Sequence, residues 1–376
     1  IATINLVVRC GSIDDGASDG LGATLLLSRM LTQGNATFPT AEQLAMHLET
    51  MGAVYGVSVE PDITSVVASL PLTELPAALD AAIAIATTPT WPEQAFRQER
   101  RRLASQFRAA WAIPASRSHD LMDRLLYPGT SEGRTAKDLA EAIPSLRAYD
   151  LQSVHDTRFR PAGAALAIAT PGDLTAALDL AEAAVDSWQG SAPAREPAVA
   201  GGTKRFAGAS MTSDLTYLVM AAPGVPRSHP DLDGLNVMAV TLGGGATSRL
   251  FLEVRERRGL CYGIGCRLAA HSAGGVIAID AGVPTDRLAE AVGAIHGQID
   301  ELAQQATEDE VAKAKALLLG HLAMESDHPA TWARRFGRDL VQLNRIRTHQ
   351  EVIDSISAIT VADVRRLAGA YLSRNR

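Results

Sequence analysis

The chain repeats one arrangement of strands and helices twice, and this duplication constrains its fold more than any other feature of the sequence. In each half an apolar strand ends at a glycine and is followed by Asp-Gly-Leu and an apolar helix. The strands are expected over 1–10 and 215–222, and the helices end at Gly34 and at Gly243–Gly245. Such a shared order of elements indicates a repeated structural unit.

A predicted β-hairpin follows in each half. Tyr55-Gly56-Val57 opens the first, with a turn at Pro61-Asp62, and Tyr262-Gly263-Ile264 opens the second, with a turn over 271–275. Each hairpin precedes an apolar helix with a period of 3.6 residues and then a long charged helix. The sequence therefore predicts an α+β chain of two homologous domains, each an antiparallel-rich sheet with helices packed on it.

The domain boundaries follow from a segment rich in Pro and Gly between the halves. It covers 190–209 and is typical of a linker, which gives an N-terminal domain over 1–189 and a C-terminal domain over 210–376. Two domains agree with a length of 376 residues.

The two halves differ at their ends. In the first half Phe159-Arg160-Pro161 leads into an apolar strand over 164–169, whereas the second half reaches Tyr371-Leu372-Ser373 and stops at Arg376. We therefore expect that a closing strand of the second sheet is missing. The start at Ile1, inside a predicted strand, likewise indicates a missing N-terminal segment.

Composition excludes several classes of protein. With 35 Lys and Arg against 42 Asp and Glu, the net charge of −7 argues against nucleic acid as a partner. No apolar run approaches the ~20 residues that a membrane span needs. The three cysteines, Cys10, Cys261 and Cys266, form neither a disulfide framework nor a zinc knuckle.

The histidines offer one weak candidate for a metal site. None of the nine lies in a His-x-x-x-His or His-x-x-Glu-His pair. His321, Glu325 and His328 share one helical stripe, but Asp327-His328-Pro329 favours the end of a helix, where a histidine interacts well with the helix dipole. We therefore prefer the helix end to the metal site.

The segment from Leu242 to Ile264, LGGGATSRLFLEVRERRGLCYGI, holds the most informative pair of residues. Arg255 and Tyr262 stand seven positions apart across a helix-to-strand turn at Gly259. A guanidinium is a planar fork of donors for carbonyls or carboxylates, and a phenol is one directional donor. On residue types alone, two ordinary residues at a helix end are the favoured interpretation.

This segment closely resembles the C-terminal motif of the pitrilysin/insulinase family of zinc peptidases, which includes mitochondrial processing peptidase. The family motif is close to LGGGxSSRLFxEVREKRGLxYxV, and the resemblance extends from Gly11-Ser12 through Phe159-Arg160-Pro161 to cover nearly the whole chain. It implies paired domains of the pitrilysin type (LuxS/metallohydrolase-like). It also implies that Arg255 and Tyr262 bind the peptide substrate.

The first half departs from the family at the zinc site. Family enzymes carry His-x-x-Glu-His on the first helix, with Met and Gly after it, and a third ligand seven residues after the Glu of a Glu-Arg pair. Aligned on Met30 and Gly34, and on Glu99-Arg100, the ligand and general-base positions are occupied by Leu25, Ser28, Arg29 and Gln106. Leucine cannot bind zinc, a guanidinium repels it and an amide is a poor ligand. The resemblance therefore implies a chain without a metal or other cofactor that is inactive alone.

The family's two-subunit members pair an inactive subunit with a zinc-bearing one. We therefore expect a non-catalytic, substrate-binding subunit of a heterodimeric zinc metallopeptidase, with Arg255 and Tyr262 contacting the peptide and zinc on the homologous partner. The alternatives are a structural core subunit, as in a respiratory complex, and a module that binds unfolded peptides without cutting them. The Ala-rich chain and its apparent processing favour a bacterial exported protein, in the periplasm rather than the cytoplasm.

Overall fold

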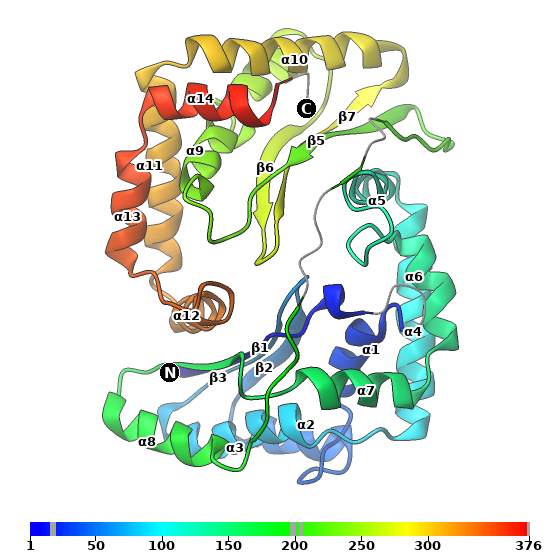
Figure 1. The fold of residues 1–376 in the computed structure, drawn as a ribbon, viewed down its shortest axis with the longest axis vertical. Coiled ribbons are helices and arrows are strands. Elements are labelled where there is room, and N and C mark those ends of the chain that lie inside the picture. The colour runs from blue at the N-terminus through cyan, green and yellow to red at the C-terminus, as the bar shows by residue number, and fades with distance from the viewer. Residues whose placement is uncertain (16–19, 196–200, 203–205, 374–376) are drawn as a thin grey trace. The chain divides into compact units, whose positions relative to one another are not determined.

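The computed structural model describes residues 1–15, 20–195, 201–202 and 206–373, which form two compact units. Unit 1 comprises Ile1–Ala109, Gly129–Glu196 and Glu325–Ile346. Unit 2 comprises Ala110–Pro128, Pro197–Met324 and Arg347–Arg376. Each unit contains one antiparallel sheet and its own hydrophobic core (Figure 1).

The sheet of unit 1 has four strands in the order β2-β3-β1-β4. Their bounds are Ala2–Val8 for β1, Val54–Val59 for β2, Thr64–Leu70 for β3 and Ala164–Ala169 for β4. Every neighbouring pair is antiparallel, and Ile4 of the central strand β1 lies between Ala68 and Ile168. The predicted hairpin and the strand after Phe159 are therefore confirmed.

One face of this sheet carries the main core of unit 1. The helices of this part of the chain are α1 (Ala23–Met30), α2 (Ala41–Thr50), α3 (Leu75–Thr87), α4 (Glu93–Ala112), α6 (Ala136–Ala142), α7 (Ala148–Arg158) and α8 (Leu174–Val185). Alternate side chains of β1, such as Ile4 and Leu6, are buried with Leu26, Leu27 and Met30 of α1. This packing places α1, which carries the expected zinc-site positions Leu25, Ser28 and Arg29, against the sheet.

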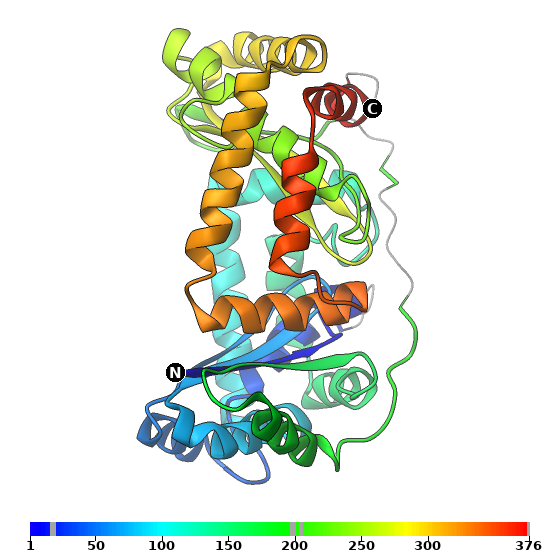
Figure 2. The ribbon, with the colours of Figure 1, turned by 90° about the vertical axis from the view of Figure 1, so that its left-hand side faces the viewer.

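The other face of the same sheet is covered by a helix from the second half of the chain. This helix, α12 (Pro329–Leu343), lies over β1 and β4 (Figure 2). The Asn5 side-chain amide donates to the Ala333 carbonyl at 3.3 Å, and Arg9 donates to the Val341 carbonyl at 2.6 Å. Gly337 lets α12 approach β1 closely, because a Cβ at this position would lie 2.7 Å from Cγ2 of Val7.

The sheet of unit 2 has three strands among the described residues, in the order β5-β7-β6. Their bounds are Leu215–Pro223 for β5, Ile264–Ala270 for β6 and Gly275–Pro284 for β7. Both pairs are antiparallel, which confirms the predicted hairpin. One face is packed by the remaining α-helices of this half, α9 (Leu232–Gly243), α10 (Leu288–Gln305), α11 (Glu308–Glu325), α13 (His349–Ala358) and α14 (Val361–Tyr371).

The second face of this sheet is covered by a helix from the first half, α5 (Pro114–Leu126). Met122 is buried with Val276 and Ala278 of β7, and the Tyr127 hydroxyl donates to the Gly275 carbonyl at 3.0 Å. The compact units thus differ from the predicted domains 1–189 and 210–376 by an exchange of α5 and α12. Both helices are amphipathic, and their sequences do not specify which sheet they cover.

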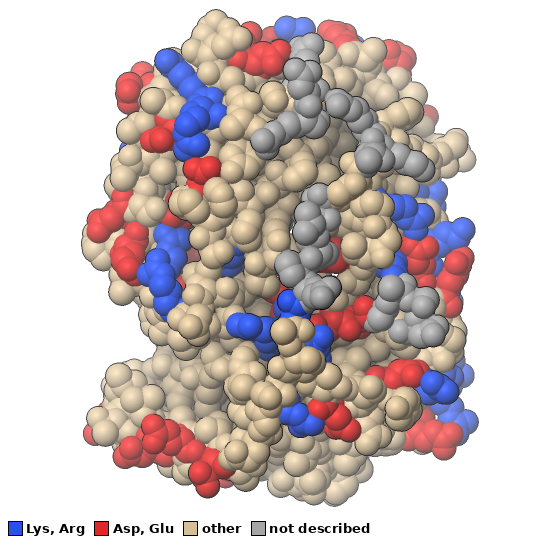
Figure 3. Space-filling view, in the orientation of Figure 1, with Lys and Arg blue, Asp and Glu red and all other residues tan. Residues whose placement is uncertain are grey.

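Short elements complete the chain. They are the 3₁₀-helices η1 (Ser12–Asp14), η2 (Leu72–Glu74), η3 (Ile143–Ser145) and η5 (Thr285–Arg287), and the π-helix η4 (Phe251–Arg257). The described part of the predicted linker 190–209 has neither helix nor strand, and its residues 196–200 and 203–205 lie outside the described residues. No helix in the described ranges is long and apolar enough to cross a membrane. On the face drawn in Figure 3, acidic side chains gather over α8, and elsewhere both signs of charge are interspersed.

Candidate functional site

The motif from Leu242 to Ile264 folds as a helix end, a π-helix and the start of a strand. Gly243 closes α9 directly against β6, since a Cβ there would lie 2.5 Å from the backbone nitrogen of Cys266. Gly259 has a φ of +59°, in the left-handed region that glycine adopts at little cost, and it turns the chain from η4 toward β6. The glycines of the motif therefore set the position of η4 relative to the sheet.

The structure brings Arg255 and Tyr262 together. The guanidinium carbon of Arg255 lies 4.3 Å from the centre of the Phe251 ring and 5.5 Å from the centre of the Tyr262 ring. Both distances are within the range of a cation–π interaction. Two aromatic rings therefore orient the guanidinium, and Phe251 is a residue that the sequence-based prediction missed.

Both side chains remain open to solvent in unit 2. The Tyr262 side chain is 88% exposed, and its hydroxyl has no hydrogen-bond partner among the described residues. The Arg255 side chain is 33% exposed, and its only ion pair in the described ranges is a 3.6 Å contact with Glu256. Most donors of this pair are therefore available to a ligand with carbonyl or carboxylate oxygens.

The neighbouring Arg257 and Arg258 form shorter ion pairs than Arg255 does. Arg258 and Arg257 donate to the carboxylate of Glu253 at 2.8 and 3.0 Å. These two bonds hold the pKa of Glu253 below its ordinary value. Arg255 is thus the arginine of η4 that is left to interact with a ligand.

The thiol of Cys261 beside this pair is not activated. Burial raises its pKa above the ordinary value, although the Arg255 charge acts in the opposite direction. Burial raises the pKa of Cys266 to about 12. A protonated thiol is a poor nucleophile and a poor metal ligand, so these cysteines do not add chemistry to the site.

Two of the four substituted zinc-site positions meet in space. Arg29 on α1 donates from Nη2 to Oε1 of Gln106 on α4, at 3.2 Å. Ser28 donates to the carbonyl of Leu25 at 2.8 Å, and Leu25 packs against the core of unit 1. The residues here are a guanidinium, an amide, a hydroxyl and an apolar chain, which do not fit a zinc ion. No group of three or more His, Cys, Asp or Glu side chains within the described ranges could hold a metal.

The stripe of His321, Glu325 and His328 is divided by a helix end. Helix α11 ends at Glu325, and His328 is the N-cap residue of α12. The predicted helix end is therefore confirmed, but the expected dipole interaction is wrong, because His328 stands at the N-terminus of α12 rather than in the last turn of α11.

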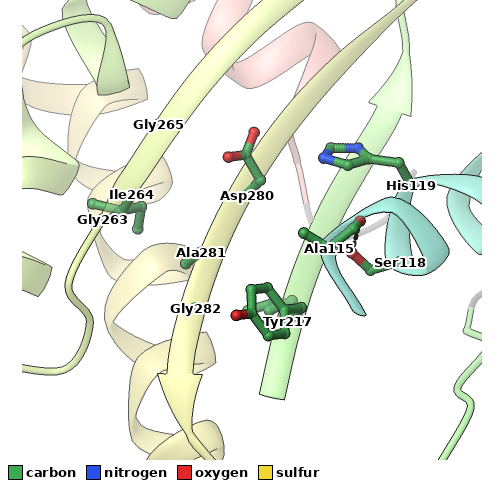
Figure 4. Close-up of a pocket in the computed structure, with 11 residues that line it drawn as sticks. Ala115, Ser118, His119, Tyr217, Gly263, Ile264, Gly265, Asp280, Ala281 and Gly282 are labelled. Carbon is green, nitrogen blue, oxygen red and sulfur yellow. Dashed lines mark hydrogen bonds between the residues drawn. The ribbon is translucent and has the colours of Figure 1, made fainter. Parts of the chain in front are cut away.

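A second set of polar residues, on α5 and on the sheet of unit 2, was missed. His119 accepts a hydrogen bond from Arg267, and the side chains of His119 and Asp280 both line a cavity (Figure 4). The signal in the sequence was the glycines at 263, 265 and 282, which leave room above the strands. It was not interpretable without knowing that α5 packs on this sheet.

Two family models cover most of the chain. Residues 1–140 match the model described as insulinase (peptidase family M16), and residues 145–318 match the model described as peptidase M16 inactive domain. An uncharacterized zinc protease of Streptomyces coelicolor is 22% identical over 382 residues, which cover 99% of this chain and 83% of that protein.

Solved structures of low sequence identity share the fold. A peptidase M16 inactive domain from Pseudomonas fluorescens aligns with a TM-score of 0.91 and 21% identity, over 99% of this chain and 90% of that one. A chain of Complex III2 from Candida albicans aligns with a TM-score of 0.81 and 16% identity, over 98% and 88%. Together with the two family models, the retained motif around Arg255 and Tyr262 and the altered zinc positions lead to one conclusion: the chain belongs to the insulinase (M16) family of peptidases and lacks that family's zinc-binding motif.

Proposed function

We propose that this chain is the non-catalytic, substrate-binding subunit of a heterodimeric zinc peptidase. The observation that carries the proposal is the partly exposed Arg255 guanidinium, which lies near the rings of Phe251 and Tyr262 beside the exposed Tyr262 hydroxyl. The substituted zinc-site positions, Arg29 and Gln106 among them, support a subunit that depends on a partner for hydrolysis. In this proposal, the zinc belongs to a homologous subunit with an intact His-x-x-Glu-His motif.

Arg255 and Tyr262 would bind oxygens of the peptide substrate. The guanidinium offers a fork of N–H donors to a backbone carbonyl, and the phenol hydroxyl offers one more. If one of these donors contacts the oxygen on which charge develops, its removal costs about 3–4 kcal/mol of transition-state stabilisation. If both contact remote carbonyls, their removal weakens substrate binding instead.

The first experiment asks what the chain does alone and with its partner. We expect the purified chain to bind no stoichiometric zinc and to leave unfolded peptides uncut. We expect affinity purification from the native cells to recover a zinc-bearing homologue together with peptidase activity. Zinc and peptidase activity on the isolated chain would contradict the proposal.

The second experiment tests the pair within the assembled complex. Arg255→Ala and Tyr262→Phe should each lower kcat/KM for an unfolded peptide, and Arg255→Lys should not fully restore it, because an ammonium lacks the planar fork. Arg257→Ala is the matched control, since Arg257 lies on the same π-helix with a side chain that is 72% exposed. Unchanged kinetics for Arg255→Ala and Tyr262→Phe would exclude a substrate-binding role.

Two other functions are outcomes of these experiments. The fold shared with a chain of Complex III2 makes a structural core subunit one alternative. Recovery of a stable assembly without peptidase activity would favour that role. Tight binding of unfolded peptides by the chain alone, with no partner, would favour a peptide-binding module.

A further inference from the structure

Unit 2 has a cavity of about 400 Å³ on the face of its sheet that carries α5. This volume lies within the range of ligand-binding pockets, about 300–1,000 Å³. Figure 4 shows the cavity over β7, with Ile264 of β6 on one side and Tyr217 of β5 and helix α5 on the other. Neither the zinc-site positions nor Arg255 and Tyr262 line it.

The cavity exists because α5 covers only part of this face. Side chains alternate along β7, so Ile277, Ile279 and Ala281 enter the core, and Asp280 and Gly282 face the side of α5. Helix α5 buries Met122 farther along the strand, against Val276 and Ala278. Over Asp280 and Gly282 the face stays open. There Gly265 pairs with Asp280, and Gly282 pairs with Tyr217.

One end of the cavity is polar, and its hydrogen bonds define the protonation of His119. Nδ1 of His119 lies 3.1 Å from Nη2 of Arg267, which can only donate. Nδ1 is therefore the acceptor and Nε2 carries the proton of a neutral imidazole. Burial and the Arg267 charge both lower the pKa of His119, which agrees with the neutral form.

Three polar groups in the cavity are left without a hydrogen bond in the described part of the chain. They are Nε2 of His119, the hydroxyl of Tyr217 and the carboxylate of Asp280. The nearest cation to Asp280 is Arg267, whose Nε lies 3.9 Å from Oδ1, beyond hydrogen-bond distance. The cavity therefore presents a donor and an acceptor close together above a flat floor of glycine backbone.

We propose that this cavity binds the phenol side chain of a tyrosine in a peptide. Its hydroxyl would accept a hydrogen bond from Nε2 of His119 and donate one to Asp280. Its ring would lie on the glycine floor beside Tyr217, in an aromatic contact. A basic side chain would bind more weakly in this cavity, because the positive charge of Arg267 already offsets the negative charge of Asp280.

The inference rests on the proposed function in one respect, since a bound peptide substrate would supply the tyrosine. The cavity begins at Gly263, the residue after Tyr262, so both sites belong to one stretch of the chain. A tyrosine in this cavity would make the subunit select among substrates as well as hold them.

The direct test measures small ligands on the full chain without a partner. Titration followed by NMR or calorimetry should detect N-acetyl-tyrosinamide, with N-acetyl-phenylalaninamide about tenfold weaker because it leaves the donor and the acceptor unpaired. N-acetyl-argininamide should be weaker still. Equal binding of all three, preferred binding of the arginine derivative or no detectable binding would overturn the proposal.

Variants locate the binding. Gly282→Val fills the floor, and a Cβ at this position meets its nearest neighbour, Cε1 of Tyr217, at an ordinary 3.8 Å. We expect it to abolish binding, and His119→Ala to weaken binding about tenfold, with unchanged thermal unfolding. His321→Ala, at an exposed histidine of α11, is the matched control and should bind like the natural chain. A Gly282→Val variant that is folded and still binds would overturn the proposal.

The same variants separate this inference from the proposed function. In the assembled peptidase, loss of preference for tyrosine-containing peptides in Gly282→Val, with Arg255→Ala lowering turnover on all peptides, would support both. If Arg255→Ala acts but Gly282→Val does not, the cavity proposal fails alone. If the chain binds N-acetyl-tyrosinamide through His119 but Arg255→Ala has no effect, the proposed function fails and the cavity proposal holds.

Discussion

Nη2 of Arg29 lies 3.2 Å from Oε1 of Gln106, which joins α1 to α4 across 77 positions of sequence. The resemblance to the family motif assigns these two positions to zinc ligands. The arginine donates a hydrogen bond to the glutamine, and this bond joins the two helices. The side chains at these two positions thus meet through a hydrogen bond rather than through a metal ion.

Restoring the ligands should restore metal binding. The variant Leu25→His/Ser28→Glu/Arg29→His/Gln106→Glu places two imidazoles at i and i+4 on α1 and a carboxylate on α4. We expect it to bind one zinc ion per chain, measured by elemental analysis and by cobalt spectroscopy. The triple variant that keeps Gln106 is the control and should bind more weakly. A folded quadruple variant without zinc would show that these positions do not converge as the Arg29–Gln106 contact indicates.

The two aromatic side chains near Arg255, Phe251 and Tyr262, should matter for function more than for folding. Phe251→Ala removes the nearer of the two rings on Arg255, at 4.3 Å, and frees the guanidinium to move. We expect a smaller loss of kcat/KM in the assembled complex than with Arg255→Ala. Tyr262→Phe should change the free energy of unfolding by less than about 0.5 kcal/mol, because this side chain is exposed. A loss of stability that matches the loss of turnover would assign the pair a structural role.

Asp15 should make the stability of unit 1 depend on pH. Its buried carboxylate accepts hydrogen bonds from the backbone of Gly22 and from Thr24 at the start of α1. Burial raises its pKa from 3.8 to about 6, against those hydrogen bonds. The folded state therefore binds this proton more tightly than the unfolded state. This difference contributes on the order of 2–3 kcal/mol to the free energy of unfolding below pH 3.8. The contribution is lost as the pH rises to about 6.

Urea unfolding between pH 4.5 and 7.5 measures this effect. Asp15→Asn should flatten the pH dependence below pH 6, because the amide does not titrate, whereas Asp309→Asn, at an exposed carboxylate of α11, should leave it as it is. A natural chain and an Asp15→Asn variant with parallel pH profiles would contradict the assignment.

Gly337 should be intolerant of a side chain. A Cβ at this position of α12 would lie 2.7 Å from Cγ2 of the buried Val7 and 3.2 Å from Nδ2 of Asn5. Gly337→Ala should therefore lower the free energy of unfolding by about 1–3 kcal/mol, measured by chemical denaturation. Gly320→Ala in α11 is the matched control, since nothing lies within 4 Å of its Cβ, and it should stabilise by about 0.5–1 kcal/mol. Equal effects of the two substitutions would mean that α12 does not pack closely on β1.

Local periodicity explains which elements could be predicted. The alternation of Val57 and Val59, and the turn at Pro61-Asp62, specify a hairpin within a few residues, and β2 and β3 form there. The pair of Arg255 and Tyr262 was expected from the resemblance to the family motif, and the turn at Gly259 brings the two residues together. These features depend on neighbours in sequence, which a single chain displays directly.

Features that depend on distant parts of the chain escaped prediction. The sequence of α5 shows an apolar stripe. It does not show that Met122 packs on Val276, which lies far along the chain in β7. Without that placement, nothing linked His119 to Asp280. The π-helical hydrogen bonding of η4 was missed for a related reason, because it differs from an α-helix by one residue per bond and leaves no pattern in composition.

Because α5 and α12 are exchanged, each half of the chain supplies the helix that covers one face of the other half's sheet. If the chain were cut within 190–209, the fragment 1–189 would still carry α5, whose apolar face fits the sheet of unit 2, and the fragment 210–376 would carry α12, whose face fits the sheet of unit 1. Such fragments should reassociate without a covalent link, and neither should be stable when produced alone. Each compact unit is therefore completed by a helix that the other half of the chain supplies.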